Sequence, residues 1–153
     1  MAYEEKLTSL GITLPPAPKP LAAYVPAVKT GGFVYTSGQL PMANGQLEYK
    51  GKVGAEITSE QGYQAARSCV LNCLSVIKAE LGTLDQIEQI VKVVVFVNSH
   101  PGFSQQPAVA NGASELLREI FGEAGQHARS AVGVSELPMD AAVEVEMIVK
   151  IRD

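Results

Sequence analysis

The sequence predicts an α+β domain in which one mixed sheet carries two helices on one of its faces. Three observations lead to this prediction. Residues 90–97, IVKVVVFV, form an almost unbroken run of β-branched residues, which is typical of a strand buried on both faces or nearly so. Residues 143–151, VEVEMIVKI, alternate as a strand with one covered face does. Two longer stretches, within 58–81 and 104–121, place apolar residues at helical spacing.

The expected elements follow one another in the order β-β-(β)-α-β-α-β-β, so both helices are expected on one face of the sheet. A glycine-bearing turn, Thr30-Gly31-Gly32, joins the first two strands, and Asn44-Gly45 marks a turn in the loop-like residues 38–57. The expected strands cover residues 24–29, 33–37, 90–97, 128–134 and 143–151, with a further short strand near 47–49.

Both ends of the first long helix are marked in the sequence. Thr58 is an N-cap and Gln61, three residues later, completes a capping box. Gly82 is suited to the C-cap. The second helix begins at Ser104 or Pro107 and ends at Phe121, because glycines follow it.

The first 23 residues form an N-terminal extension. Residues 3–10 predict a short helix, and the four prolines between 15 and 20 enforce an extended chain after it. The total of 153 residues is typical of one domain that buries its own core. We therefore expect a single domain over 1–153, with the extension at 1–23 and the core at 24–153.

Composition excludes several classes of protein. The net charge is −4, which argues against a nucleic-acid-binding surface. No apolar run reaches membrane-spanning length, and the charged N-terminus has no apolar signal core, so we expect a cytoplasmic protein without membrane contact. The two cysteines, Cys69 and Cys73, are expected to be packing residues on one helix face. Neither histidine has a Cys or Asp at metal-ligand spacing, so no metal site is predicted.

Three short segments lie in register with a known family pattern. They are Thr36-Ser37-Gly38-Gln39-Leu40-Pro41, then Arg129-Ser130-Ala131-Val132-Gly133-Val134, and finally Leu137-Pro138 followed by Val143-Glu144-Val145-Glu146. Together they resemble the RidA family, also called the YjgF or L-PSP family, over residues 22–153. The extension and an expanded segment before the second helix, GFSQQPAVANGAS, resemble a longer-chain branch of that family.

The resemblance implies a chorismate-mutase-like fold and a homotrimer whose sheets form a central barrel, with clefts between subunits. It also implies hydrolysis of reactive 2-imino and enamino acids to 2-keto acids and ammonia, without a cofactor or metal. By the same resemblance, Arg129 binds the substrate carboxylate and Glu144 positions or activates the hydrolytic water. Tyr24, in the first strand, and Ser37 match cleft residues. Backbone groups near Ala131 complete the carboxylate cradle.

Several features leave alternatives open. Ala131 stands where well-known deaminases often carry Cys, so the cleft either catalyses or only binds a small carboxylate. A deaminase of aromatic breakdown would use the same Arg and Glu, and the family's reported endoribonuclease activity is a third reading that the acidic composition disfavours. The family's helix asparagine matches either Asn111 or Ser114. His127 has no role in the family pattern and is treated as peripheral, and Gly38 is interpreted as a backbone requirement.

Overall fold

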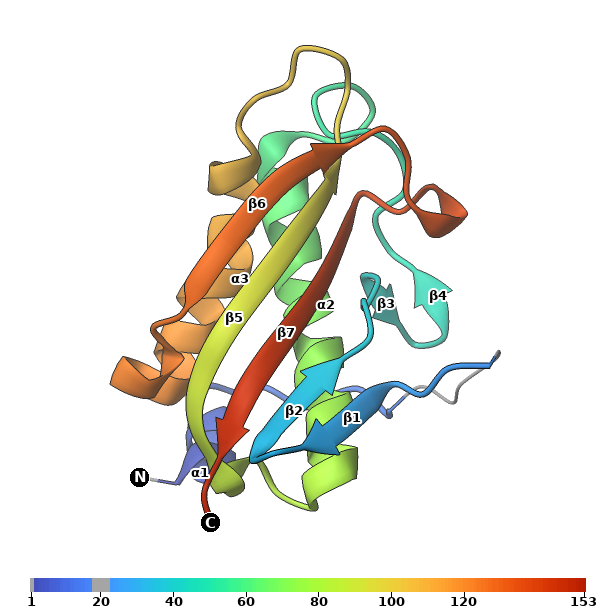
Figure 1. The fold of residues 1–153 in the computed structure, drawn as a ribbon. Helices are drawn as coiled ribbons and strands as arrows, with labels where there is room; N and C mark the ends of the chain where they lie inside the picture. Colours follow the sequence, from blue (N-terminus) through green and yellow to red (C-terminus); the bar gives the residue numbers. More distant parts are fainter. Residues whose placement is uncertain (1, 18–22) are drawn as a thin grey trace.

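The structure is a computed structural model that describes residues 2–17 and 23–153. Its regular elements follow the predicted order closely (Figure 1). The helices and strands are α1 (Tyr3–Ser9), β1 (Ala27–Thr30), β2 (Phe33–Thr36), β3 (Met42–Ala43), β4 (Gln46–Leu47), α2 (Ser59–Leu81), β5 (Ile87–Asn98), α3 (Gln106–Phe121), β6 (Ala128–Val134) and β7 (Val143–Ile151). Short 3-10 turns lie at Leu84–Gln86, Gly122–Gly125 and Pro138–Asp140.

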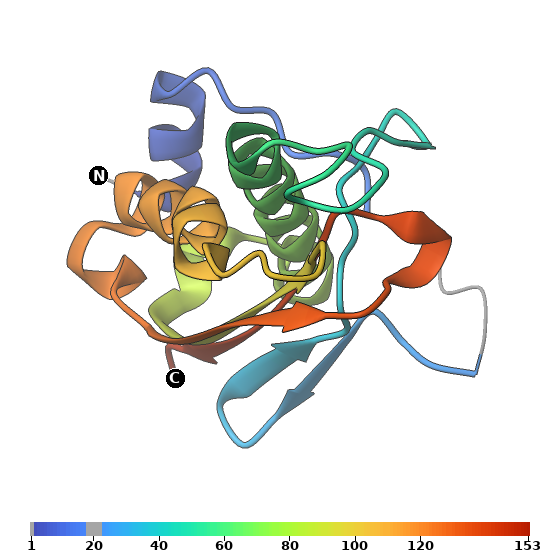
Figure 2. The same ribbon diagram turned by 90° about the horizontal axis from the view of Figure 1, so that it is seen from above.

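Five strands form one mixed sheet in the order β1-β2-β7-β5-β6. The β5–β6 pair is parallel and the other neighbours are antiparallel. Figure 2 shows α2 and α3 side by side over one face of this sheet, while the described residues place no helix on the opposite face. The predicted α+β class, the mixed sheet and the placement of both long helices are confirmed.

The capping box that starts α2 is present as predicted. The Thr58 side chain accepts from the Gln61 backbone N–H, and the Gln61 side chain accepts from the Thr58 backbone N–H. The helix ends at Gly82, whose φ of 87° is accessible to glycine at little steric cost. These local signals determine the ends of α2 because a cap satisfies backbone groups that no helical partner can reach.

The first strand is shorter than expected. It begins at Ala27 rather than at residue 24, and Pro26 precedes it. Proline has no N–H with which to continue the ladder, so the chain before it departs from the sheet. The short strand expected near 47–49 instead pairs as β4 with β3 through the Asn44-Gly45 turn, where both residues have positive φ.

The prediction that the 90–97 run is buried on both faces is wrong for the single chain. Val93, Val95 and Val97 are fully buried under the helices, whereas Val94 and Phe96 are only half-buried on the other face. The same division holds in β7, where the side chains predicted to lie under the helices are all buried: Val143, Val145, Met147, Val149 and Ile151. The open face of the sheet thus exposes apolar surface that a continuous β-branched run would normally bury.

Both cysteines are packing residues, as expected. Cys69 and Cys73 are fully buried in α2 beneath β7, and they form no disulfide. Burial raises the pKa of Cys73 to about 12, so this side chain is a neutral thiol at physiological pH. Within the described part of the chain, no helix is both long and apolar enough to cross a membrane.

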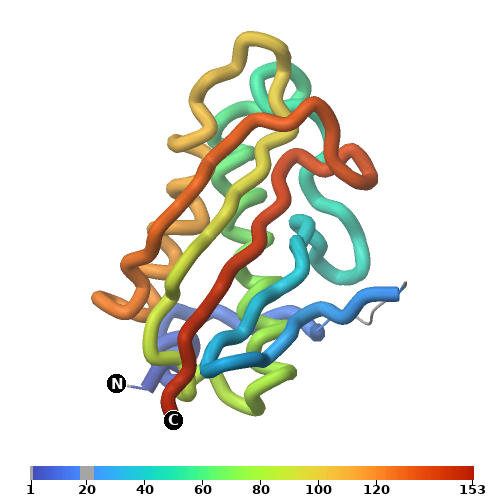
Figure 3. The backbone as a smooth tube through the Cα atoms, viewed as in Figure 1, coloured from blue at the N-terminus to red at the C-terminus, as the bar shows by residue number. Residues whose placement is uncertain are grey.

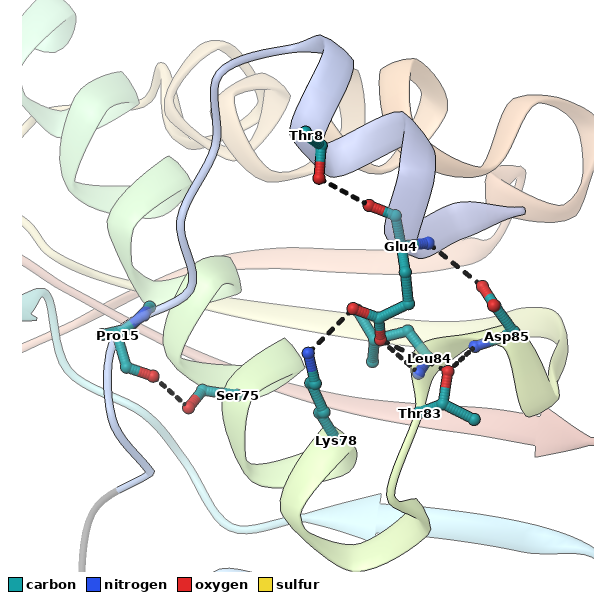
Figure 4. Close-up of polar contacts among 8 residues, drawn as sticks. All are labelled: Glu4, Thr8, Pro15, Ser75, Lys78, Thr83, Leu84 and Asp85. Atoms are coloured by element: carbon teal, nitrogen blue, oxygen red, sulfur yellow. Dashed lines mark hydrogen bonds and ion pairs between the residues drawn. The ribbon is translucent and has the colours of Figure 1, made fainter. Parts of the chain in front are cut away.

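The helix of the N-terminal extension, α1, is docked on the domain rather than loose beside it. Leu7 of α1 is 4% exposed, and the ring of Tyr3 meets Phe121 edge-on with centroids 4.6 Å apart. The Glu4 carboxylate accepts from the backbone N–H of Leu84 and pairs with Lys78, at 2.8 Å each (Figure 4). The extension therefore adds to the core and links the end of α2 to the start of β5.

Candidate functional site

Arg129 is held by α3 at one end of its guanidinium group. It lies in β6 opposite the buried Val93, so its side chain is on the helix-covered side of the sheet. Its Nη1 donates to Asn111 Oδ1 at 2.8 Å and to Ser114 Oγ at 3.1 Å. Both N–H groups of Nη1 are thereby used, whereas no hydrogen bond within the described residues engages Nε or Nη2. That free edge is the fork with which arginine grips a carboxylate bidentately.

Both candidates for the family's helix asparagine, Asn111 and Ser114, contact Arg129. Asn111 and Ser114 are three residues apart in α3, so they share one helix face. This face lies along β6, and the two side chains accept from the same nitrogen of Arg129. The guanidinium is thus oriented by two acceptors before any ligand arrives.

His127 belongs to the same network, although the sequence alone did not indicate a role for it. Its Nδ1 lies 2.6 Å from the Gly125 carbonyl oxygen and its Nε2 lies 2.9 Å from Ser114 Oγ. A carbonyl can only accept, so Nδ1 carries the proton and Nε2 accepts from the Ser114 hydroxyl. Ser114 in turn accepts from Arg129. The hydrogen bonds therefore run in one direction, from Arg129 through Ser114 and His127 to Gly125.

Electrostatics support a neutral His127. Burial lowers its pKa and the nearby charge of Arg129 lowers it further, which outweighs the opposite effect of its bond to Gly125. The signal that could have identified this residue is strand alternation. Residues 127 and 129 are two apart and therefore share a face, which is the face that α3 covers.

β6 is an edge strand, and its backbone leaves free groups beside Arg129. The Val134 carbonyl accepts from the Ser99 N–H, so it points toward the chain that continues β5. Backbone direction alternates along a strand, which turns the N–H and C=O of Ala131 toward the open edge. The backbone N–H and C=O of Ala131 are therefore available to contact a ligand, whereas its half-buried methyl group packs against the core.

Glu144 lies in a separate cluster at the start of β7. Its carboxylate approaches Gly38 so closely that a Cβ added at Gly38 would lie 1.9 Å from Oε1. Gly38 is not among the residues with positive φ, so the interpretation of a backbone requirement is wrong. The Glu144 side chain occupies the space beside Gly38, so a larger residue at this position would displace the carboxylate. Burial raises the pKa of Glu144, and the negative charge of Glu146 raises it further.

Ser37 brings the segment that contains Tyr24 to this cluster. Its hydroxyl donates to the Val25 carbonyl at 2.6 Å, and its backbone N–H donates to Pro26 at 2.8 Å. Tyr24 is 57% exposed and lies before β1, so the prediction that it is part of the first strand is wrong. Ser37 therefore ties the chain just after Tyr24 to the loop beside Glu144.

A single chain does not bring Arg129 and Glu144 together. Strand β5 lies between β6 and β7, as the chain path in Figure 3 shows. Arg129 is level with Val93, whereas Glu144 is level with Phe96, three residues further along β5. Val93 and Phe96 also face opposite sides of the sheet. The predicted residues thus form two half-sites, one of Arg129 and Ala131 and one of Glu144, Ser37 and the Tyr24 segment.

The described residues contain no group of three or more His, Cys, Asp or Glu side chains that could hold a metal ion. The guanidinium of one half-site and the carboxylate of the other are suited to anion binding and to proton transfer. A fixed guanidinium edge binds an anion, and a half-buried carboxylate with a raised pKa can accept and return a proton.

The chain is similar to known proteins over almost its whole length. Residues 4–151 match the family model described as "YjgF/chorismate mutase-like, putative endoribonuclease". The chain is 47% identical over 148 residues to Protein TCP17 of Trypanosoma cruzi, covering 96% of this chain and 92% of that one. It is 34% identical over 141 residues to a Dermatophagoides farinae protein named 2-iminobutanoate/2-iminopropanoate deaminase, covering 92% and 95%.

The solved structures show the same fold. The crystal structure of Atu1372 from Agrobacterium tumefaciens, a protein of unknown function, superposes with a TM-score of 0.91 at 43% identity. The superposition covers 98% of this chain and 92% of that one, and so includes the N-terminal extension. Family match, relatives and fold coincide over almost the whole sequence, and the chain therefore belongs to the YjgF family, the RidA family whose motifs it carries.

Proposed function

We propose that this protein hydrolyses 2-imino acids and their enamine tautomers to 2-keto acids and ammonia. The observation that carries the proposal is the geometry of Arg129. One nitrogen is anchored by Asn111 and Ser114, while the Nε–Nη2 edge is left to grip a carboxylate next to the free backbone of Ala131. The similarity to a relative named for this activity supports the same reaction.

The proposed reaction needs only water as a second reactant. Arg129 and the Ala131 N–H hold the substrate carboxylate, which places C2 of the imine at a defined position. Glu144 accepts a proton from water while the water oxygen bonds to C2, and the imine nitrogen takes up a proton. Glu144 then gives its proton to the nitrogen of the resulting carbinolamine, the C2–N bond breaks and ammonia leaves. The hydroxyl proton is released to solvent, which replaces the proton that the imine nitrogen took up and leaves the keto acid.

The separation of the half-sites supports an active site shared between subunits. Each chain presents Arg129 on the edge strand β6 and Glu144 on the central strand β7, on opposite faces of the sheet. A contact that joins unlike surfaces repeats head-to-tail, and it forms a ring when the rotation between neighbours closes. The homotrimer expected for the family is such a ring. The exposed apolar side chains on the open sheet face would lie inside it: Val28 at 48% exposure, Tyr35 at 42% and Val132 at 42%.

The activity is tested by generating 2-iminobutanoate in situ and following its disappearance. We expect the wild-type protein to exceed the buffer rate, and Arg129→Ala and Glu144→Gln to lose most of that excess. Arg67→Ala is the matched control, because Arg67 lies on α2 and pairs with Glu119. A wild-type rate equal to that of buffer would refute the proposal for this substrate.

The shared site has its own test, in which the two inactive variants are unfolded, mixed and refolded together. In a ring of three, each interface joins Arg129 of one chain to Glu144 of the next. Such an interface is intact only where the first chain is the Glu144→Gln variant and the second is the Arg129→Ala variant. Random assembly leaves about a quarter of all interfaces intact, so about a quarter of the wild-type activity should return. If one chain holds a complete site, the mixture remains inactive.

Ala131 favours a second candidate function. Its methyl group can neither donate a proton nor attack, so the cleft could bind small carboxylates without turnover. In that case 2-ketobutyrate raises the melting temperature, while imine decay stays at the buffer rate.

A further inference from the structure

A second arginine lies beside Arg129 in an open pocket at the end of α3. The pocket has a volume of about 270 Å³ and is bounded by both arginines and by small or neutral polar groups. Its lining residues are Ser114, Arg118, Gly125, Gln126, His127 and Arg129. None of them is acidic. The pocket adjoins the side chain that the proposed function assigns to the substrate carboxylate.

Helix geometry explains why Arg118 lies there. Asn111, Ser114 and Arg118 are spaced by three and four residues, so they form one row on α3. The first two members of this row bond Arg129, and Arg118 continues it by one turn toward Gly125. The row is therefore a polar face that follows the edge of the sheet.

The acidic side chains of α3 are directed to α2 instead. Glu115 accepts from the Tyr63 hydroxyl at 2.5 Å, and Glu119 pairs with Arg67 at 3.9 Å. The ion pairs found among the described residues include neither Arg118 nor Arg129. Because His127 is neutral, the pocket carries two formal positive charges without a carboxylate in its lining. Such a pocket favours anions.

We propose that Arg118 binds a second carboxylate, so that the preferred ligands are 2-imino diacids and their 2-keto diacid products. This inference rests on the proposed function, which assigns the first carboxylate to Arg129. A four- or five-carbon diacid carries its second carboxylate at the far end of a short flexible chain. With the first carboxylate on Arg129, the second reaches the same pocket and meets Arg118. A monoacid of equal length places a methyl group there and gains no such contact.

The proposal is tested by titration calorimetry with two stable five-carbon ligands, 2-oxoglutarate and 2-oxopentanoate. These differ at the end of the chain, where one carries a carboxylate and the other a methyl group. We expect the wild-type protein to bind the diacid about fivefold more tightly, since one charge-assisted contact at a partly exposed site is modest. Arg118→Gln should bring the ratio of the two dissociation constants close to one. Arg118→Glu should reverse the preference, whereas Arg67→Gln should retain the wild-type ratio.

The outcomes separate this inference from the proposed function. Equal or weaker binding of the diacid by the wild-type protein overturns the inference, as does a ratio that Arg118→Gln leaves unchanged. In both cases hydrolysis of 2-iminobutanoate still stands or fails in its own assay. If imine hydrolysis is absent but the ratio depends on Arg118, the diacid pocket holds and the protein is a binder.

Discussion

Replacing Glu4 by alanine should destabilise the whole domain, although this residue lies in the N-terminal extension. Its carboxylate accepts from the backbone N–H of the fully buried Leu84 and from Lys78, both at 2.8 Å (Figure 4). The bond from the Thr83 hydroxyl, at 3.4 Å, is too long to contribute much. The variant therefore leaves one backbone donor without its charged acceptor and removes one ion pair.

The expected loss follows from these two contacts. A backbone N–H that donates to a charged acceptor contributes about 1.5 kcal/mol. The pair with Lys78 is partly exposed, at 44% for Lys78 and 28% for Glu4, and contributes about 0.5 kcal/mol. The free energy of unfolding should thus fall by about 2 kcal/mol, which lowers the melting temperature of a domain of this size by about 4–8 °C.

Thermal unfolding followed by circular dichroism measures the shift, with Glu5→Ala as the control. Glu5 is the next residue of the same helix turn and is exposed, so its replacement should change the melting temperature by less than about 1 °C. If Glu4→Ala behaves like Glu5→Ala, the docking of the extension through this carboxylate is refuted.

The effect of Glu4 also has a defined pH dependence. Burial alone raises its pKa, but the bond from Leu84 and the pairing with Lys78 outweigh burial and lower the pKa below 4.5. A carboxyl with a lowered pKa in the folded state stabilises above its unfolded pKa and loses that effect as the pH falls through the folded value. The difference between wild type and Glu4→Ala should therefore be constant well above pH 4.5 and shrink below it.

Three further predictions concern the site and the helix pair. Gly38→Ala should displace the Glu144 carboxylate and reduce imine hydrolysis by about tenfold or more, with little change in melting temperature; unchanged activity would contradict this. Imine hydrolysis should rise with pH through a Glu144 pKa above 4.5, because burial and Glu146 raise it; a rise centred at or below 4.5 would exclude this assignment. Gly112→Ala would place a Cβ 2.0 Å from the Tyr63 carbonyl oxygen, force α2 and α3 apart and cost about 3 kcal/mol; an unchanged urea midpoint would contradict the close helix contact.

Local patterns in the sequence determined where the elements lie. The predicted strands at 128–134 and 143–151 coincide with β6 and β7, and the capping box starts α2 at Ser59. These features depend on neighbours within about four residues, because caps, alternation and helical period act over one turn or one pleat. Where Pro26 interrupts a strand, the local pattern was misleading and the structure starts β1 later.

Only the tertiary structure decided how the candidate residues combine. The motif identified Arg129 and Glu144 by type and position, but strand order inserted β5 between their strands and turned them to opposite faces. Likewise, α3 brought Asn111 and Ser114 to Arg129 and connected His127 to them. The order of strands that are distant in sequence depends on which apolar faces pack together, and no short segment carries that information. The sequence by itself therefore determined the family, the elements and the residue types of the site, whereas long-range packing decided that one chain holds two separate half-sites.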